Sequence, residues 1–179
     1  NIKPLFSYEK DNFNVTCLGL TSHLGTHLDV PLHLIENGRN ICDFPVDTFW
    51  GKGLCISFEN LENFDFDFIK NIDYLLIYTG WDKYWDKEDY FKDYPIISKE
   101  IVEKIANSHL KGIGIDCISP DSYNSKEMGN HKLLLAADKI IVENLCELEN
   151  ILNKEFYFSC IPLKTAIDGC PIRAVAIEM

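Results

Sequence analysis

The amino-acid sequence predicts an α/β protein in which helices pack on a mixed sheet. Two observations indicate this class: short apolar runs typical of strands alternate with helical segments, and the strands outnumber the helices. The chain has 179 residues, of which 46% are hydrophobic, so it can bury one substantial core. This length leaves little room for a second core, and we expect residues 1–179 to form a single domain.

The first half of the chain contains three strand patterns. Phe13, Val15 and Cys17 alternate with polar neighbours, as in a half-buried strand, and residues 54–58 form a second short run. Residues 74–78 form a continuous apolar stretch, which predicts a strand that is buried on both faces.

In the second half of the chain, predicted helices and strands alternate after a long irregular segment. Residues 81–95 mix aromatic and charged side chains without a period, which is typical of a surface loop that serves as a lid or a partner contact. Ser98 is placed to cap a helix with one apolar face. The remaining predicted elements are a strand at 113–115, a short helix at 132–137 and strands at 140–142, 155–161 and 172–177.

Composition excludes several classes of function. A net charge of −11 would repel a phosphate backbone, and no cluster of Lys and Arg offers a local exception, so no nucleic acid is expected as a partner. No apolar run reaches the roughly 18 to 20 residues that cross a membrane, and no secretion signal is recognisable. The seven cysteines are scattered without a C-x-x-C pair, which favours buried thiols in a reducing cytoplasm over a thiolate zinc site. We therefore expect a cytoplasmic protein that binds a small-molecule substrate.

Three of the five histidines lie within residues 23–33, together with Asp29. These side chains are ligands for divalent metals, and without a neighbouring cysteine they indicate zinc, manganese or iron(II). The alternative is that the histidines are ordinary core or surface residues, but their close spacing favours a metal site that includes His23 and His27. A zincin peptidase is excluded, because H-E-x-x-H requires a glutamate where Leu24 stands.

The backbone must bend for these side chains to meet. In a regular helix Asp29 would lie about 200° from His27, at roughly 100° per residue. In a flat strand His23 and Asp29 would share a side but stand about 20 Å apart, at roughly 3.3 Å per residue. Gly25 has the backbone freedom that a bend requires, and Pro31 prevents continuation as an ordinary helix or central strand.

The pattern H-x-G-T-H-x-D-x-P-x-H over residues 23–33 resembles that of the cyclase family, which includes bacterial kynurenine formamidases and isatin hydrolases. The resemblance implies a single-domain cyclase-like fold of the swivelling β/β/α type. It covers most of the chain. The other similar segments are Leu76 to Trp81, Gly114-Ile115-Asp116 with Ser119 and Asp121, His131 with Leu133-Leu134-Leu135, and Val142-Glu143-Asn144-Leu145.

His131 and Glu143 are weak candidates by spacing alone. A continuous helix would hold them about 120° and 18 Å apart, whereas a helix-turn-strand path can bring them together. A surface histidine and a solvated carboxylate are the alternatives. The resemblance implies that His23, His27 and Asp29 bind one Zn²⁺ or Mn²⁺ ion, and that His131 and Glu143 complete a second site through a bridging carboxylate, although some relatives use a single ion.

The resemblance further implies a hydrolase of amide or formamide C–N bonds, most concretely an arylformamidase of tryptophan catabolism that converts N-formylkynurenine to kynurenine and formate. A bound ion lowers the pKa of water from about 15.7 to roughly 7 and so supplies hydroxide, and His33 would transfer the proton. The alternatives are lactam, cyclic amide or ester hydrolysis, as in isatin hydrolases, and a metal-binding module without turnover. Trp81, Tyr84 and Trp85 either line an aromatic pocket or pack a surface loop or subunit contact.

The resemblance also implies a homodimer. At the N-terminus the resemblance to the family is incomplete. Family members begin with a strand that carries an Asp-Leu-Ser-like motif, ahead of the part that resembles residues 1–12. We expect this chain to lack that strand and part of the substrate pocket, but not the metal ligands. His109 matches no family segment and is assigned to the end of the helix that begins near Ser98.

Overall fold

The computed structural model describes residues 1–178 and centres on an eight-stranded mixed sheet. Its strand order is β10-β8-β4-β5-β6-β7-β3-β9, with the run from β4 to β7 parallel and the flanking strands antiparallel. The predicted α/β class and mixed sheet are confirmed. The strands are β3 (His27–Asp29), β4 (Trp50–Ser57), β5 (Tyr74–Tyr78), β6 (Gly112–Ile115), β7 (Ile140–Glu143), β8 (Glu155–Ser159), β9 (Gly169–Pro171) and β10 (Val175–Glu178).

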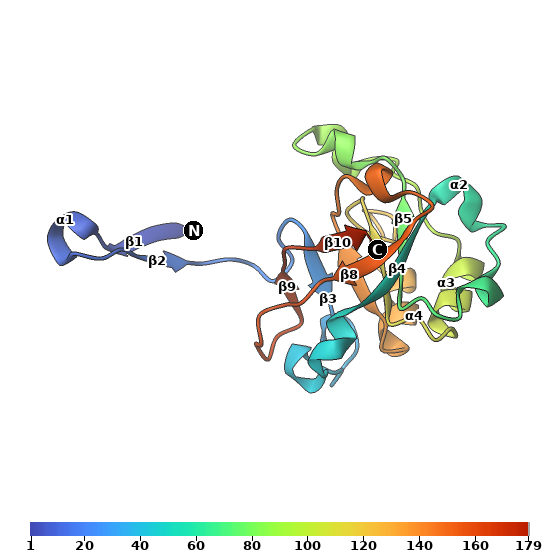
Figure 1. The fold of residues 1–179 in the computed structure, drawn as a ribbon, viewed down its shortest axis with the longest axis horizontal. Helices are drawn as coiled ribbons and strands as arrows, with labels where there is room; N and C mark the ends of the chain where they lie inside the picture. Colours follow the sequence, from blue (N-terminus) through green and yellow to red (C-terminus); the bar gives the residue numbers. More distant parts are fainter. Residues whose placement is uncertain (179) are drawn as a thin grey trace.

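Apolar side chains are buried on both faces of this sheet. Leu75 and Ile77 of β5 belong to the core beneath the helices, whereas Tyr74 and Leu76 belong to the core on the opposite face. The prediction that residues 74–78 form a strand buried on both faces is therefore confirmed. The helices α3 and α4 lie beside one another against the first core (Figure 1). The helices are α1 (Tyr8–Asp11), α2 (Phe58–Leu61), α3 (Lys99–Ala106) and α4 (Gly129–Ala136).

The N-terminal segment does not join the main sheet. The strands β1 (Ile2–Phe6) and β2 (Val15–Leu18) form a separate antiparallel ribbon, which projects from the body in Figure 1. Every residue of both strands is exposed, so the prediction of a half-buried strand over 13–17 is wrong. Alternation shows which residues share a face, but it does not show whether another element covers that face.

Three other local expectations need correction. Residues 172–177 do not form one strand, because β9 and β10 are separate strands that pair with β3 and β8 respectively. Ser98 occupies the N-cap position of α3, but its side chain makes no capping hydrogen bond. His109 lies beyond the end of α3, where its Nε2 is 3.0 Å from the carbonyl oxygen of Ile72.

The remaining expected elements are present. Residues 81–95 contain the two 3₁₀ turns Asp82–Tyr84 and Glu88–Phe91, and the helix predicted over 132–137 begins slightly earlier, at Gly129. Among the described residues, no helix combines the length and the apolar character needed to cross a membrane.

Candidate metal centre

Strand pairing places two candidate ligands directly opposite one another. His27 on β3 is the register partner of Glu143 on β7, and their Nε2 and Oε2 atoms are 3.3 Å apart. Asp29 lies two residues after His27 and therefore projects to the same face of β3. Its Oδ1 is 3.3 Å from Nε2 of His27. All three side chains are almost completely buried.

A tight turn brings His23 back to this face. Gly25 has a φ of +61°, in the region that favours glycine, and provides the bend that the spacing predicts. Nδ1 of His23 then lies 2.7 Å from Oδ1 of Asp29. Gly169 leaves room for the ring, because a Cβ atom at this position would stand 2.7 Å from Cε1 of His23.

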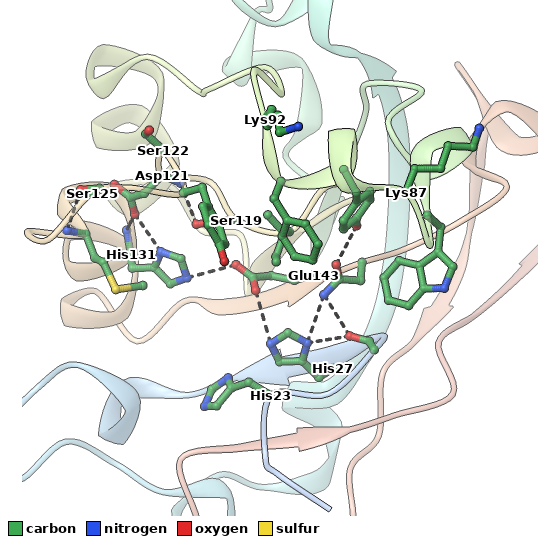
Figure 2. Close-up of a pocket in the computed structure, with 18 of the residues that line it drawn as sticks. His23, His27, Lys87, Lys92, Ser119, Asp121, Ser122, Ser125, His131 and Glu143 are labelled. Carbon is green, nitrogen blue, oxygen red and sulfur yellow. Dashed lines mark hydrogen bonds and ion pairs between the residues drawn. The ribbon is translucent and has the colours of Figure 1, made fainter.

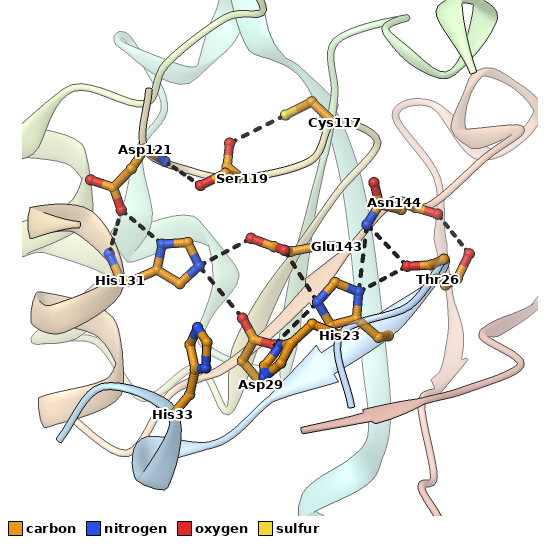
Figure 3. A network of polar contacts seen from close by, with 12 residues as sticks. His23, Thr26, Asp29, His33, Cys117, Ser119, Asp121, His131, Glu143 and Asn144 are labelled. Atoms are coloured by element: carbon orange, nitrogen blue, oxygen red, sulfur yellow. Dashed lines mark hydrogen bonds and ion pairs between the residues drawn. The ribbon is translucent and has the colours of Figure 1, made fainter. Parts of the chain in front are cut away.

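His131 reaches the cluster from α4. Its Nε2 is 3.1 Å from Oε1 of Glu143 and 3.5 Å from Oδ2 of Asp29. Its Nδ1 donates to Oδ2 of Asp121 at 2.8 Å. Glu143 therefore lies between His27 and His131, as Figure 2 shows, and Figure 3 shows His131 between Asp121 and Glu143.

In His23, His27 and His131, the ring nitrogen that points away from the cluster lies beside a hydrogen-bond acceptor. Nδ1 of His27 is 2.8 Å from the Gly25 carbonyl oxygen, and Nε2 of His23 is 2.8 Å from Oδ2 of Asp168. Because a carbonyl oxygen can only accept, the proton of neutral His27 belongs on Nδ1, which leaves the Nε2 lone pair directed at the cluster. Metal-bound histidines are typically held this way by a second hydrogen bond.

The nitrogen and oxygen atoms that face into the cluster are suited to hold a divalent cation. Nε2 of His27, both carboxylate oxygens of Asp29 and Oε1 of Glu143 are buried, and their described polar neighbours are all members of the same cluster. Four buried donor atoms that face only one another are expected where a cation is held. His23, His27 and Asp29 each present a ligand atom within 4.8 Å of the others, and nitrogen and oxygen donors of this kind suit zinc or manganese.

Electrostatics within the cluster strongly favour positive charge. Burial disfavours the charged imidazoles, but the neighbouring carboxylates outweigh it and raise the pKa of His27 to about 10 and that of His131 to about 11. Burial opposes ionisation of Asp29 as well, yet contacts with three histidines hold its pKa well below the usual value. The cluster therefore attracts cations, whether protons or a metal ion.

His33 lies beside the cluster. His33 is the last residue of a 3₁₀ turn that begins at Pro31, shortly after the end of β3. This is the position expected for a proline that prevents the strand from continuing. The His33 ring centroid is 4.0 Å from that of His23, and its Nδ1 is 3.5 Å from Oδ2 of Asp168. Burial, with the nearby His23, outweighs the attraction of Asp29 and lowers the pKa of His33. Neutral imidazole is the form that can accept a proton.

The cluster lies at the base of a cavity of about 890 Å³ that is large enough for an aromatic metabolite. Figure 2 shows Lys87 and Lys92 on the segment that overhangs it. Of the three aromatic residues expected either to line the pocket or to pack a surface loop or subunit contact, Trp85 lines the cavity and the other two do not. Trp81 instead donates from Nε1 to the Tyr90 carbonyl oxygen at 2.9 Å, and Tyr84 packs on Trp81. The apolar wall consists of Trp85, Tyr90, Phe91, Ile118, Tyr123 and Met128.

Sequence reasoning missed one polar residue of the site completely. Asp168 is 145 residues from His23, yet its Oδ2 contacts the side chains of both His23 and His33. Its place depends on the pairing of β9 with β3, which aligns Gly169 with Asp29. A single aspartate in the C-terminal quarter carries no local signal of this role.

A hydrogen-bond chain links the pocket wall to His27. The Tyr90 hydroxyl donates to Oδ1 of Asn144 at 2.7 Å, and Nδ2 of Asn144 donates to the Gly25 carbonyl oxygen at 3.0 Å. That carbonyl is the acceptor for Nδ1 of His27. Asn144 has a φ of 56°, a conformation that asparagine adopts more readily than most residues. Tyr90 and Asn144 therefore fix the acceptor that orients His27.

We expect Tyr90→Phe to weaken metal binding by roughly 10-fold, because loss of an outer hydrogen bond typically lowers metal affinity 10- to 100-fold. Competition with a chromophoric chelator would measure the change. Tyr84→Phe in the same segment is the matched control, since Tyr84 packs on Trp81 at a centroid distance of 4.7 Å and does not line the cavity. Equal affinities for the two variants would contradict the orienting role.

The buried histidine–carboxylate cluster is a candidate metal centre, and the comparisons with known proteins support a metal-dependent hydrolase. Residues 3–122 match the family model Cyclase, described as "Putative cyclase". Since this match spans more than half of the chain, the protein belongs to the cyclase family, and the predicted resemblance is confirmed.

Relatives and solved structures agree with this assignment. The chain is 39% identical over 169 residues to Uncharacterized protein MJ0783 of Methanocaldococcus jannaschii, covering 93% of this chain and 84% of the relative. It is 31% identical over 160 residues to the kynurenine formamidase of Erythrobacter litoralis, covering 87% and 72% respectively. Isatin hydrolase A from Labrenzia aggregata superposes with a TM-score of 0.82 at 19% identity, covering 99% of this chain and 82% of that structure. This last similarity confirms the cyclase-like fold.

Proposed function

We propose that the protein hydrolyses the C–N bond of an aryl formamide, with N-formylkynurenine as the substrate and kynurenine and formate as products. The observation that carries the proposal is the set of buried imidazole and carboxylate ligand atoms that face one another beside a pocket with an aromatic wall. The similarity to kynurenine formamidases supports the substrate: the chain is 31% identical to the one from Erythrobacter litoralis and 27% identical to the one from Bacillus cereus.

Five side chains would hold one or two divalent ions, with Asp29 and Glu143 between the histidines. A bound ion lowers the pKa of a water molecule to roughly 7 and polarises a carbonyl group. The two carboxylates offset part of the positive charge of the ions. The proposed ligands are His23, His27, Asp29, His131 and Glu143.

His33 would transfer the proton. It adjoins the ligands without belonging to the set proposed here, and it lines the cavity. In its neutral form it accepts a proton from the attacking water and donates that proton to the leaving nitrogen as the C–N bond breaks. Asp168, 3.5 Å from Nδ1 of His33, holds the ring in place and stabilises its charged form.

The pocket wall would bind the aromatic ring of the substrate. Trp85, Tyr90, Phe91 and Tyr123 provide flat apolar surfaces that favour an aryl group over an extended peptide. Ser119, Ser122 and Ser125 add hydroxyl groups at the same cavity, which can pair with polar groups of the ligand.

A second candidate is hydrolysis of a cyclic amide or ester. The superposition on isatin hydrolase A motivates this alternative, since the same ligand set would serve any polarised carbonyl. A metal-binding module without turnover is the third possibility, and the presence of His33 beside the ligands argues against it.

The deciding experiment is a substrate screen of chelator-treated protein reloaded with Zn²⁺ or Mn²⁺. Formamides, lactams, cyclic imides and esters would be compared, with formate release measured for N-formylkynurenine. We expect the formamides to be turned over fastest, and activity to disappear on chelation and return with metal. Preference for a lactam would select the second candidate, and retention of metal without any turnover would select the third.

Metal binding should also stabilise the fold. A ligand present at 100 times its Kd adds about 2.7 kcal/mol, which for a chain of this size raises Tm by roughly 5–11 °C. Differential scanning calorimetry of the chelated and reloaded protein would measure the shift. Glu143→Gln keeps the shape of the side chain but removes its charge, and the shift should be much smaller in that variant. An unchanged Tm in the wild-type protein on metal addition would contradict the proposed centre.

A further inference from the structure

A second cavity adjoins the main cavity, which holds the histidine–carboxylate cluster at its base. The second cavity has a volume of about 490 Å³, and four residues line both cavities: Phe91, Lys92, Ser122 and Tyr123. The ring centroids of Phe91 and Tyr123 are 5.3 Å apart, so an aromatic pair marks the junction. A ligand whose reacting group lies at the cluster can therefore extend past these two rings into the second cavity.

Two lysines line the main cavity, and their ammonium groups are placed differently. Nζ of Lys87 donates to the Lys83 carbonyl oxygen at 2.9 Å. The same atom lies 5.6 Å from the ring centroid of Tyr84, which lines neither cavity. Figure 2 shows Lys92 well apart from Lys87 on the overhanging segment. Within residues 1–178, Lys92 is the one lysine that lines both cavities, so it brings positive charge to their junction.

The ammonium group of Lys92 is available to a ligand although it already has one partner. Its Nζ donates to Oδ1 of Asp89 at 3.3 Å, and the two side chains are 58% and 72% exposed. An ion pair as exposed as this one contributes little stability. An ammonium group has three N–H donors, and this pair uses one of them. A ligand carboxylate at the junction can therefore accept a charge-assisted hydrogen bond from Lys92 without displacing Asp89.

The residue that follows Lys92 carries the opposite charge. Asp93 lines the second cavity together with the polar side chains of Ser122 and Asn124. An α-amino-acid group has a carboxylate beside an ammonium group, so its two charges are complementary to Lys92 and Asp93. Such a group has no net charge, and a chain of net charge −11 does not repel it. A dicarboxylate would meet both this repulsion and that of Asp93.

We propose that Lys92 and Asp93 bind an α-amino-acid tail of the substrate, with Lys92 pairing with the carboxylate and Asp93 with the ammonium group. The inference rests on the proposed function, which places an aryl formamide at the cluster, and it adds the class of substrate: aryl formamides with an amino-acid tail. N-formylkynurenine has such a tail. Its ring would lie against the aromatic wall, and its tail would pass Phe91 and Tyr123. Lys92 and Asp93 then determine specificity and take no part in breaking the C–N bond.

The first test compares N-formylkynurenine with o-formamidoacetophenone, which keeps the aryl formamide and the ketone but lacks the tail. In the metal-loaded protein, we expect Lys92→Met to lower kcat/KM for N-formylkynurenine by roughly 10-fold, mainly through KM, because a charged hydrogen bond is lost. Turnover of o-formamidoacetophenone should not change. Lys87→Met is the matched control, since it removes the same charge from the same segment but does not line the second cavity. It should leave both substrates unaffected.

Asp93 is tested with the analogue of N-formylkynurenine that lacks the amino group. Asp93→Asn should raise KM for N-formylkynurenine several-fold, because the ammonium group loses its partner, and it should not slow the desamino analogue. Lys92 and Asp93 are both exposed, so these variants should keep the Tm of the wild-type protein. Slower turnover of both substrates in Asp93→Asn would contradict its pairing with the ammonium group.

Binding of the reaction product tests the tail site separately from turnover. Kynurenine keeps the tail and o-aminoacetophenone lacks it, so titration calorimetry with both ligands measures the contribution of the tail. We expect Lys92→Met to bind kynurenine roughly 10-fold more weakly and o-aminoacetophenone as wild type does. Binding of kynurenine that depends on Lys92, without turnover of either formamide, would refute the proposed reaction but support the tail site. Turnover of N-formylkynurenine that is equally affected by Lys92→Met and Lys87→Met, or by neither, would overturn the inference and leave the proposed reaction standing.

Discussion

Replacing His27 with alanine is expected to remove both the metal ion and the activity. Nε2 of His27 lies 3.3 Å from a carboxylate oxygen of Asp29 and 3.3 Å from one of Glu143, so it is one of the two imidazole nitrogens, with Nε2 of His131, that lie between the buried acids. Without it, the ion loses a donor and the two buried carboxylates lose one of these neighbours. We expect metal content to fall far below one ion per chain and the rate to fall by about 10³-fold or more, since the ion supplies the nucleophile.

Metal analysis and formate release would be measured on the same preparation. His109→Ala is the matched control, because His109 is exposed and its only described polar contact is with the Ile72 carbonyl oxygen. The control should keep both metal and activity. Retention of a full complement of metal by a folded His27→Ala protein would show that the ligand set is wrong.

Replacing His33 with alanine is expected to preserve the metal but abolish most of the activity. The His33 ring adjoins His23 at a centroid distance of 4.0 Å, yet the five proposed ligands remain complete without it. Loss of a general acid–base group typically lowers the rate by about 10²- to 10⁴-fold. We expect this loss in kcat, with metal content and Tm close to those of wild type.

The His33→Ala result also separates an enzyme from a metal-binding module. If the substrate screen finds activity and His33→Ala leaves it intact, the proton must move through another group, and the role proposed for His33 is wrong. Asp168→Asn then provides an additional comparison, because Asp168 contacts His23 as well as His33. Loss of metal in Asp168→Asn but not in His33→Ala would assign Asp168 mainly to the support of His23.

Much of the centre could be predicted because its chemistry is concentrated in a short segment. The spacing of His23, His27 and Asp29 required a bend, and the positive φ of Gly25 provides it. His131 and Glu143 could not be linked by spacing, since their approach depends on the path from α4 to β7. The family resemblance grouped them, and the structure brings Nε2 of His131 within 3.1 Å of Oε1 of Glu143, while their role as metal ligands stays a prediction.

Errors arose where burial depends on distant elements. The alternation around Val15 is real, but β2 pairs only with β1 and remains exposed. Trp81 and Trp85 are equally aromatic, yet only Trp85 faces the cavity, because Trp81 is turned toward Tyr90. Side-chain direction in an irregular loop follows from the contacts of the folded protein rather than from local composition.

The sequence by itself determined the fold class, the bend around Gly25 and the kind of chemistry that His23, His27 and Asp29 can perform. These depend on side-chain type and on backbone geometry within a few residues. Only the tertiary structure decided that Asp168 supports two histidines, that Tyr90 and Asn144 orient His27, and that the ribbon of β1 and β2 projects from the body. The reason is physical: strand register and helix packing set these distances between residues far apart in the chain, and the energies that select them arise only when the segments meet.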